Sequence, residues 1–84
     1  MYKVIFDDKA IEFLEKLDTK NRDRIFNKIL STKENPFHYF EKLTARNLYK
    51  LRVGNYRIIA DINENNIKIL VLLIGHRKNI YKKL

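Results

Sequence analysis

Two residues, Gly54 and Asn55, separate two segments in which apolar and polar residues alternate. The segments run from Leu48 to Val53 and from Tyr56 to Ile62, and alternation with period two is typical of a strand with one buried face. A two-residue loop with glycine favours a tight hairpin, because glycine reaches the positive φ that such turns require. The predicted register places these residues opposite one another: Val53 and Tyr56, Arg52 and Arg57, Leu51 and Ile58.

This register sorts the side chains of the hairpin into two sets, because successive residues of a strand point to opposite faces. One set is apolar or aromatic and is expected to form a core layer: Tyr49, Leu51, Val53, Tyr56, Ile58, Ala60 and Ile62. The other set is basic and consists of Lys50, Arg52 and Arg57. Two arginines directly across from one another repel by up to about 1 kcal/mol. A bound phosphate, whose oxygens match the forked donors of arginine, relieves this repulsion better than Asp61, which lies farther from the turn.

The residues before the hairpin predict one strand and two helices. Tyr2, Val4 and Phe6 alternate with other residues and indicate a short strand. An amphipathic helix is expected from Asp8 to Leu17, with apolar residues at helical spacing. A second helix is expected after a cap at Asp18 or Thr19 and before Pro36, which prevents continuation past Asn35. The segment from 43 to 47 is expected to be irregular.

After the hairpin, residues 64–66 form a predicted turn, and Ile67 to Ile74 is so uniformly apolar that we expect a central strand covered on both faces. Gly75 is expected to end it. Residues 76–84 then form a short basic tail of one or two helical turns. The order β-α-α-β-β-β and tail predicts an α+β fold in one domain, residues 1–84, with a mainly antiparallel sheet and the helical hairpin on one face.

The basic charge is concentrated in the second half of the chain. Residues 1–41 hold eight Lys or Arg and eight Asp or Glu, whereas residues 42–84 hold ten Lys or Arg against Asp61 and Glu64, so this half carries the whole net charge of +8. A polyanion is the natural partner of such a surface. A merely solvated cationic face would explain the alternation in the hairpin but not the concentration of charge.

Several functional classes find no support in the sequence. The chain has no cysteine, no histidine and acidic cluster at metal-ligand spacing, no phosphate-binding glycine loop and no serine nucleophile with a base. Its longest apolar run is too short to span a membrane, and no signal peptide is recognisable, so we expect a soluble cytoplasmic protein. Catalysis would need no metal or cofactor if the substrate were RNA, because the neighbouring 2′-hydroxyl is a built-in nucleophile.

The tail supplies a second basic group, from Gly75 to Lys83. In a helical tail Arg77 and Tyr81 lie on one side, where a guanidinium stands near a phenol that can transfer a proton or stack on a base. Tyr81 could instead simply pack the tail against the sheet. His76 fits either a general base or a structural hydrogen-bonding group.

The segment from Leu48 to Ile58, the closing Gly75-His76-Arg77 followed by Tyr81, and the opening β-α-α unit together resemble a RelE-type toxin of the RelE/ParE superfamily. The resemblance implies cleavage of messenger RNA in the ribosomal A site, where the 2′-hydroxyl attacks the adjacent phosphate. It implies four catalytic residues: Lys50, Arg57, Arg77 and Tyr81. Further basic residues are expected to bind RNA: Arg46, Arg52, His76, Lys78 and Lys82. The chain departs from some members at Leu48, where they carry lysine, and the spacing from Arg77 to Tyr81 varies between branches.

The resemblance also implies partners. These are a RelB-like antitoxin that wraps and blocks the toxin, the ribosome and messenger RNA, and a heterotetramer with the antitoxin is one assembly that it allows. The basic face has no predicted carboxylate paired with a histidine, so we expect the ribosome to supply part of the substrate orientation. Two alternatives stay open: a ParE-like inhibitor that binds DNA gyrase, against which the four catalytic residues argue, and an RNA-binding module without catalysis.

Overall fold

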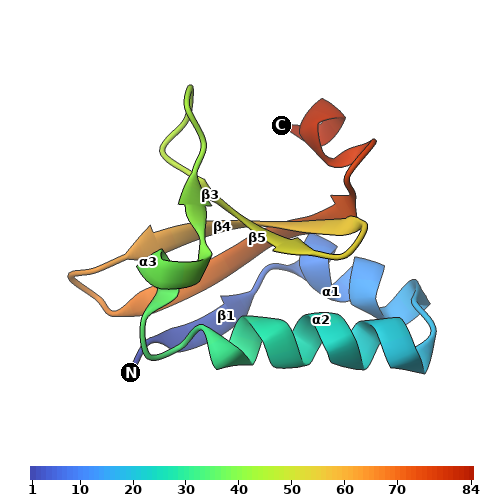
Figure 1. Cartoon of the computed structure of the whole chain (residues 1–84), viewed down its shortest axis with the longest axis horizontal. Helices are drawn as coiled ribbons and strands as arrows, with labels where there is room; N and C mark the ends of the chain where they lie inside the picture. The colour runs from blue at the N-terminus through green and yellow to red at the C-terminus, as the bar shows by residue number, and fades with distance from the viewer.

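The computed structural model describes residues 1–84, which form one sheet with two longer helices packed on one of its faces (Figure 1). The elements follow in this order: β1 (Lys3–Phe6), α1 (Asp8–Lys16), α2 (Thr19–Ser31), α3 (Pro36–Tyr39), β2 (Glu41–Lys42), β3 (Tyr49–Val53), β4 (Tyr56–Asn63), β5 (Lys68–His76) and a C-terminal 3₁₀ helix (Ile80–Lys83). The five strands lie in the order β1-β5-β4-β3-β2. Only β1 and β5 are parallel, so the predicted mainly antiparallel α+β fold is confirmed.

The hairpin of β3 and β4 has the predicted register. Arg52 lies opposite Arg57, and Val53 lies opposite Tyr56 across the two-residue turn. Gly54 adopts a φ of +56°, which a residue with a Cβ reaches only under strain. The glycine therefore fixes which side chains of the hairpin share a face.

An aspartate caps the start of each of the two longer helices. The carboxylate of Asp7 accepts a hydrogen bond of 3.1 Å from the backbone N–H of Lys9 at the start of α1. Asp18, and not Thr19, caps α2, because its carboxylate accepts hydrogen bonds from both the side chain and the backbone N–H of Asn21. The Asn21 side chain, followed by its backbone N–H, lowers the pKa of Asp18 below its ordinary value.

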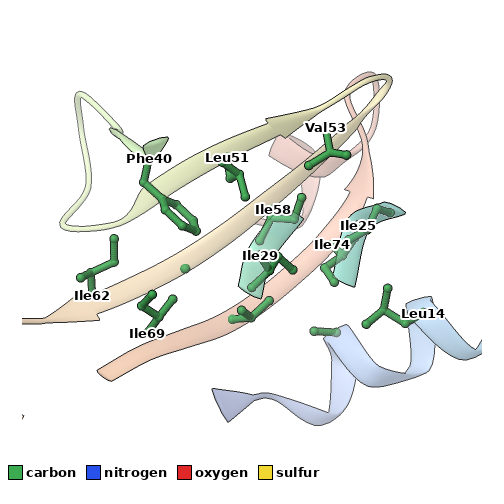
Figure 2. Close-up of a cluster of buried hydrophobic side chains, with 13 residues drawn as sticks. Leu14, Ile25, Ile29, Phe40, Leu51, Val53, Ile58, Ile62, Ile69 and Ile74 are labelled. Carbon is green, nitrogen blue, oxygen red and sulfur yellow. The ribbon is translucent and has the colours of Figure 1, made fainter. Parts of the chain in front are cut away.

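The core lies between the helices and one face of the sheet (Figure 2). From the helices it takes Ala10, Leu14, Ile25 and Ile29. From β3 and β4 it takes the buried members of the predicted apolar set: Leu51, Val53, Ile58, Ala60 and Ile62. Tyr49 and Tyr56, the aromatic members of that set, pack against its margin half-buried. The predicted core layer is confirmed.

Three expectations about the elements were wrong. The second helix ends at Ser31, within the limit that Pro36 sets at Asn35, but the chain then forms the short helix α3 and the short strand β2, neither of which was expected. β5 continues past Gly75 to His76, because β4 is long enough to pair with both residues. Ile67 stands in the turn before β5 with a φ of 52° and is therefore outside the strand.

β5 is buried on the helical face but only in part on the other, so the expectation of cover on both faces was wrong for part of its length. The cover on this second face comes from the tail, which lies with the β2–β3 loop on the side away from α1 and α2 (Figure 1). Ile80 of the tail is fully buried, and its Cδ1 lies 3.0 Å from where a Cβ on Gly75 would stand. Ile59 of β4, on the same face, is also fully buried. The tail thus closes one end of the second face and leaves the other open.

Candidate functional site

The three basic residues of the hairpin, Lys50, Arg52 and Arg57, line one pocket of about 430 Å³. They come from the face of β3 and β4 that α1 and α2 leave uncovered. β2 pairs only with Tyr49 and Lys50, so the outer edge of β3 is free from residue 51 onward. The pocket opens along this free edge, which lets side chains from the far side of the sheet approach it.

The guanidinium of Arg57 is held in place by the hairpin turn. Its Nη1 donates hydrogen bonds to the carbonyl oxygens of Gly54, at 2.9 Å, and Tyr56, at 2.8 Å. Its Nη2 and Nε make no hydrogen bond within the protein. Since arginine has five N–H donors in a planar fork, most of the fork stays free to bind an anion.

Lys50 has one acidic neighbour. Its Nζ lies 3.9 Å from Oε2 of Glu41 on β2, with side-chain exposures of 36% and 79%. Exposed ion pairs of this kind contribute little to stability, with a median of about 0 to 1 kcal/mol. Lys50 can therefore leave Glu41 for a phosphate at small cost.

The tail begins beside the hairpin turn. The backbone N–H of Arg77 donates a hydrogen bond of 2.8 Å to the carbonyl oxygen of Asn55. Gly75 lies opposite Arg57, so Arg77 follows at the same end of the sheet. Arg77 is exposed and lines a neighbouring hollow of about 290 Å³ with Lys78. Arg77 is thus near the basic pocket but not in it.

Tyr81 lies farther away along the tail. It is 45% exposed and lines a third hollow, of about 260 Å³, together with Arg46 of the β2–β3 loop. Nη2 of Arg46 donates a hydrogen bond of 3.2 Å to the main-chain oxygen of Leu84, which ties this loop to the tail. The structure therefore brings Lys50, Arg52 and Arg57 together and leaves Tyr81 in a separate hollow. Lys82 is exposed on the same tail.

His76 stands on the helical side of the sheet. It pairs with Tyr56, and the two ring centroids are 4.9 Å apart. The ring of Phe13 in α1 meets it edge-on at 6.0 Å. His76 is thus an exposed member of an aromatic cluster on the face opposite Arg57, and its expected contact with RNA remains a prediction.

Four residues that the sequence did not single out complete the wall of the basic pocket: Lys28 of α2, His38 and Tyr39 of α3, and Glu41 of β2. No hydrogen bond joins His38 to Glu41, so the pocket holds no oriented pair of histidine and carboxylate. The pattern Asn35-Pro36, with proline suited to the first position of a helix, was the signal that could have revealed α3.

No group of three or more histidine, aspartate or glutamate side chains is arranged to hold a metal ion. No helix has the length and apolar character needed to cross a membrane.

Comparison with known proteins identifies the class. Residues 4–81 match the family described as the ParE toxin of the type II toxin-antitoxin system parDE. The chain therefore belongs to the RelE/ParE superfamily of toxins from type II toxin-antitoxin systems. No curated protein matches the sequence.

Solved structures of RelE toxins share the fold. The RelBE2 toxin-antitoxin complex from Mycobacterium tuberculosis gives a TM-score of 0.83 at 22% identity, over 90% of this chain and 98% of that one. The isolated RelE toxin of E. coli gives a TM-score of 0.77 at 22% identity, over 99% of this chain and 94% of that one. The RelB-RelE complex from Methanococcus jannaschii gives 0.72 at 26% identity, over 95% and 98%. The expected resemblance and the RelE-like fold are confirmed.

Proposed function

We propose that this toxin is an endoribonuclease of the RelE type, which cleaves messenger RNA in the ribosomal A site without a metal ion. The observation that carries the proposal is the convergence of Lys50, Arg52 and Arg57 on one pocket of the open sheet face. Three cations with one weakly held carboxylate make a site for a phosphate, and forked guanidinium donors match its oxygens.

In the proposed reaction the 2′-hydroxyl of the substrate attacks the adjacent phosphorus. O2′ loses its proton as its bond to phosphorus forms, O5′ gains a proton as its bond to phosphorus breaks, and the products are a 2′,3′-cyclic phosphate and a 5′-hydroxyl. The free donors of Arg57 stabilise the negative charge that develops on the phosphate oxygens, and Arg77 adds a second guanidinium from the start of the tail. Lys50 assists charge or proton movement.

We propose one of two roles for Tyr81, which lies outside the pocket of Lys50, Arg52 and Arg57. It lies with Arg46 in its own hollow, so it either stacks on a neighbouring base or reaches the phosphate when the tail shifts. Tyr81→Phe separates the two roles. A ring that only stacks tolerates the loss of the hydroxyl, whereas a proton donor or acceptor loses about 100-fold to 10,000-fold in rate.

Dependence on the ribosome follows from the weak acid and base equipment of the pocket. His38 and Glu41 line it without a hydrogen bond between them, so neither is oriented for proton transfer by the other. A ribosome that fixes the geometry of the message supplies the orientation that the protein lacks.

The test is primer-extension mapping of a defined message with and without translating ribosomes, in the presence of a metal chelator. The proposal expects cuts within codons that depend on ribosomes and persist in chelator. Rapid cutting of naked RNA would overturn the ribosome dependence, and a strict metal requirement would overturn the mechanism.

A second candidate is inhibition of DNA gyrase, because the matching family is named for the ParE toxin. This function would use the same fold without RNA chemistry. A supercoiling assay with purified gyrase distinguishes the two: inhibition of gyrase without any cutting of messages would assign the protein to the ParE type.

We also propose that a RelB-like antitoxin covers the basic face in the host, in the cytoplasm where both proteins would act. Relatives from Mycobacterium tuberculosis and Methanococcus jannaschii have been solved as complexes with their antitoxins. An acidic or flexible segment of the antitoxin would neutralise Arg52 and Arg57. Purification of the toxin from its host with any bound partner tests this, and recovery of the toxin alone would argue against it.

A further inference from the structure

An exposed tyrosine stands on the wall of the basic pocket. The chain has five tyrosines, and three of them, Tyr2, Tyr49 and Tyr56, pack half-buried against the core. Tyr39 and Tyr81 do not, and are 40% and 45% exposed. Tyr39 shares its pocket with Lys50, Arg52 and Arg57, whereas Tyr81 shares its hollow with Arg46. Its ring is therefore not required by the packing of the core.

The helix that carries Tyr39 is firmly anchored although it is short. Pro36 is fully buried at its start, and Phe40, directly after it, is 5% exposed in the main core. The N–H of Phe40 donates a hydrogen bond of 2.8 Å to the carbonyl oxygen of Pro36. The backbone of α3 is thus fixed at both ends, and Tyr39 is presented to the pocket from a rigid support.

Two neighbours restrain the ring of Tyr39. Nζ of Lys28 lies 5.1 Å from its centroid, over the ring, and the ring of His38 meets it edge-on at 4.9 Å. A cation on one face attracts the π-electrons and limits the rotation of the side chain. Lys28 comes from α2 and reaches the same pocket as Lys50, Arg52 and Arg57 past the free edge of β3.

We propose that Tyr39, supported by Lys28, is a stacking platform for one base of a single-stranded RNA whose phosphate lies on Lys50, Arg52 and Arg57. Sites for single-stranded nucleic acid combine cations that follow the backbone with aromatic rings on which bases stack. The pocket has both, four cations and an exposed ring, within one hollow of about 430 Å³. The inference rests on the proposed binding of RNA and adds a base-binding subsite to it.

A protein segment is the competing occupant, because an acidic peptide would also suit the four cations. The planar, rigidly held ring favours the nucleobase, since stacking needs a flat exposed face and every base provides one. An acidic segment would be bound through the cations alone and would depend little on the aromatic ring of Tyr39.

The probe is a short single-stranded RNA, 2′-O-methylated so that it is not cut, with 2-aminopurine at one position. A base of this kind loses fluorescence when it stacks on an aromatic ring. A parallel series carries an abasic residue at each position in turn, and binding is measured by anisotropy at low salt. At one position we expect the unaltered protein to bind the complete RNA about tenfold more tightly than the abasic RNA.

The variants are Tyr39→Leu and Tyr39→Phe, with Phe26→Leu as a matched control. Phe26 is 39% exposed, stacks on Phe6 and lies outside the pocket. Tyr39→Leu should abolish both the quenching and the tenfold difference, whereas Tyr39→Phe and Phe26→Leu should keep them.

Three outcomes would overturn the platform: a base-dependent difference that survives in Tyr39→Leu, no RNA binding by the unaltered protein, or a Tyr39→Leu defect in antitoxin binding with RNA binding unchanged. The proposed nuclease fails separately. If the base-dependent binding is present but no message is cut on ribosomes, the stacking role of Tyr39 is supported and the nuclease activity is contradicted. If messages are cut but Tyr39→Leu binds RNA like the unaltered protein, the nuclease activity is supported and the stacking role of Tyr39 is contradicted.

Discussion

Alternate residues of β3 and β4 form the two faces of the hairpin, and the two faces have different surroundings. On the helical face Leu51 and Ile58 are opposite one another and fully or nearly fully buried. On the other face, one residue along each strand, Arg52 and Arg57 are opposite one another and line an open pocket. Because side chains alternate along each strand, one set of residues packs in the core and stabilises the fold, and the other set lines the candidate site. Substitutions on the two faces should affect different measurements.

The open face is less uniform than the helical face. Ile59 of β4 is fully buried on this face, and so is Ile80 of the tail, which packs against Gly75 of β5. At the free edge of β3 nothing covers Arg52. The open face thus consists of a small apolar core that holds the tail and of an exposed basic surface. Only the basic surface has the features of a binding site.

The largest expected effect is the loss of activity in Arg57→Ala and Arg77→Ala. In the proposed reaction each variant removes one donor to the transition state, and such a loss typically lowers the rate by about 100-fold to 1000-fold. Growth inhibition should disappear at equal expression, while the free energy of unfolding falls by about 1 kcal/mol or less, since Arg57 also bonds to the turn. Ribosome-dependent cleavage assays and chemical denaturation measure the two quantities.

The control for these variants is Lys68→Ala. Lys68 is an exposed cation at the far end of β5, opposite Lys3 and Asn63. The Lys68→Ala substitution also removes one positive charge, but at the far end of the sheet, and it should leave toxicity intact. Full toxicity of Arg57→Ala, or equal loss in Lys68→Ala, would break the assignment of the site to one end of the open face.

The association rate with the antitoxin should fall as salt is added, by about tenfold or more between low and high ionic strength. The net charge of +8 is carried by the half of the chain that forms the open face, and steering between opposite charges is screened by salt. Stopped-flow association at several salt concentrations measures the slope. An association rate independent of salt would indicate that the partner meets the apolar surface of the toxin instead of the basic face.

A substitution on the helical face should lower stability and leave activity unchanged, which is the opposite of the result expected for Arg57→Ala. Ile58→Val removes one methylene from a fully buried position and should lower the free energy of unfolding by about 0.5 to 1.5 kcal/mol. Cleavage per folded molecule should stay the same, because the side chain points away from the pocket. A variant that unfolds like the unaltered protein but cuts slowly would show that the two faces are not independent.

The smallest expected effect concerns the cap of α2 and its dependence on pH. Hydrogen bonds from Asn21 lower the pKa of Asp18 in the folded chain, so the ionised carboxylate favours folding. This contribution is present above the unfolded pKa of about 3.9 and is lost as pH falls through the lower folded pKa. Asp18→Ala should therefore melt at a lower temperature at pH 7, and the difference should narrow in acid.

Asp18→Asn is the control for that experiment, since asparagine caps helices well and does not titrate. Thermal melts of the three proteins from pH 7 down to pH 2 give the comparison. A difference between Asp18→Ala and the unaltered protein that is constant with pH would mean that the charge of the carboxylate contributes nothing to the cap.

The hairpin could be predicted closely because its information is local. Gly54 and Asn55 fix the turn, and the alternation of residues then fixes both faces, including Lys50 and the two arginines. The two longer helices, α1 and α2, followed from apolar spacing and capping residues. β2 has only two residues, and the pairing that defines it depends on β3. A strand so short leaves no periodic pattern in the sequence.

The rest of the site depends on contacts between distant segments. Tyr39 reaches the pocket because buried Pro36 and Phe40 hold α3 in place, and Lys28 reaches it from α2, where its Nζ lies over the Tyr39 ring. The separate position of Tyr81 follows from Ile80 packing on Gly75, which spacing along the tail does not encode. His76 reaches the helical side through its pairing with Tyr56, which only the register of β4 and β5 reveals.

We propose that the open basic face promotes attack by the 2′-hydroxyl of a message held on the ribosome. The most direct test is a message with a single 2′-deoxy nucleotide on the 5′ side of the mapped cut, compared with the all-ribose message in chelator. The ribose message should be cut to a 2′,3′-cyclic phosphate, and the substituted message should stay intact at this position. Equal cutting of both messages would contradict it, because the attacking group would then not be the 2′-hydroxyl.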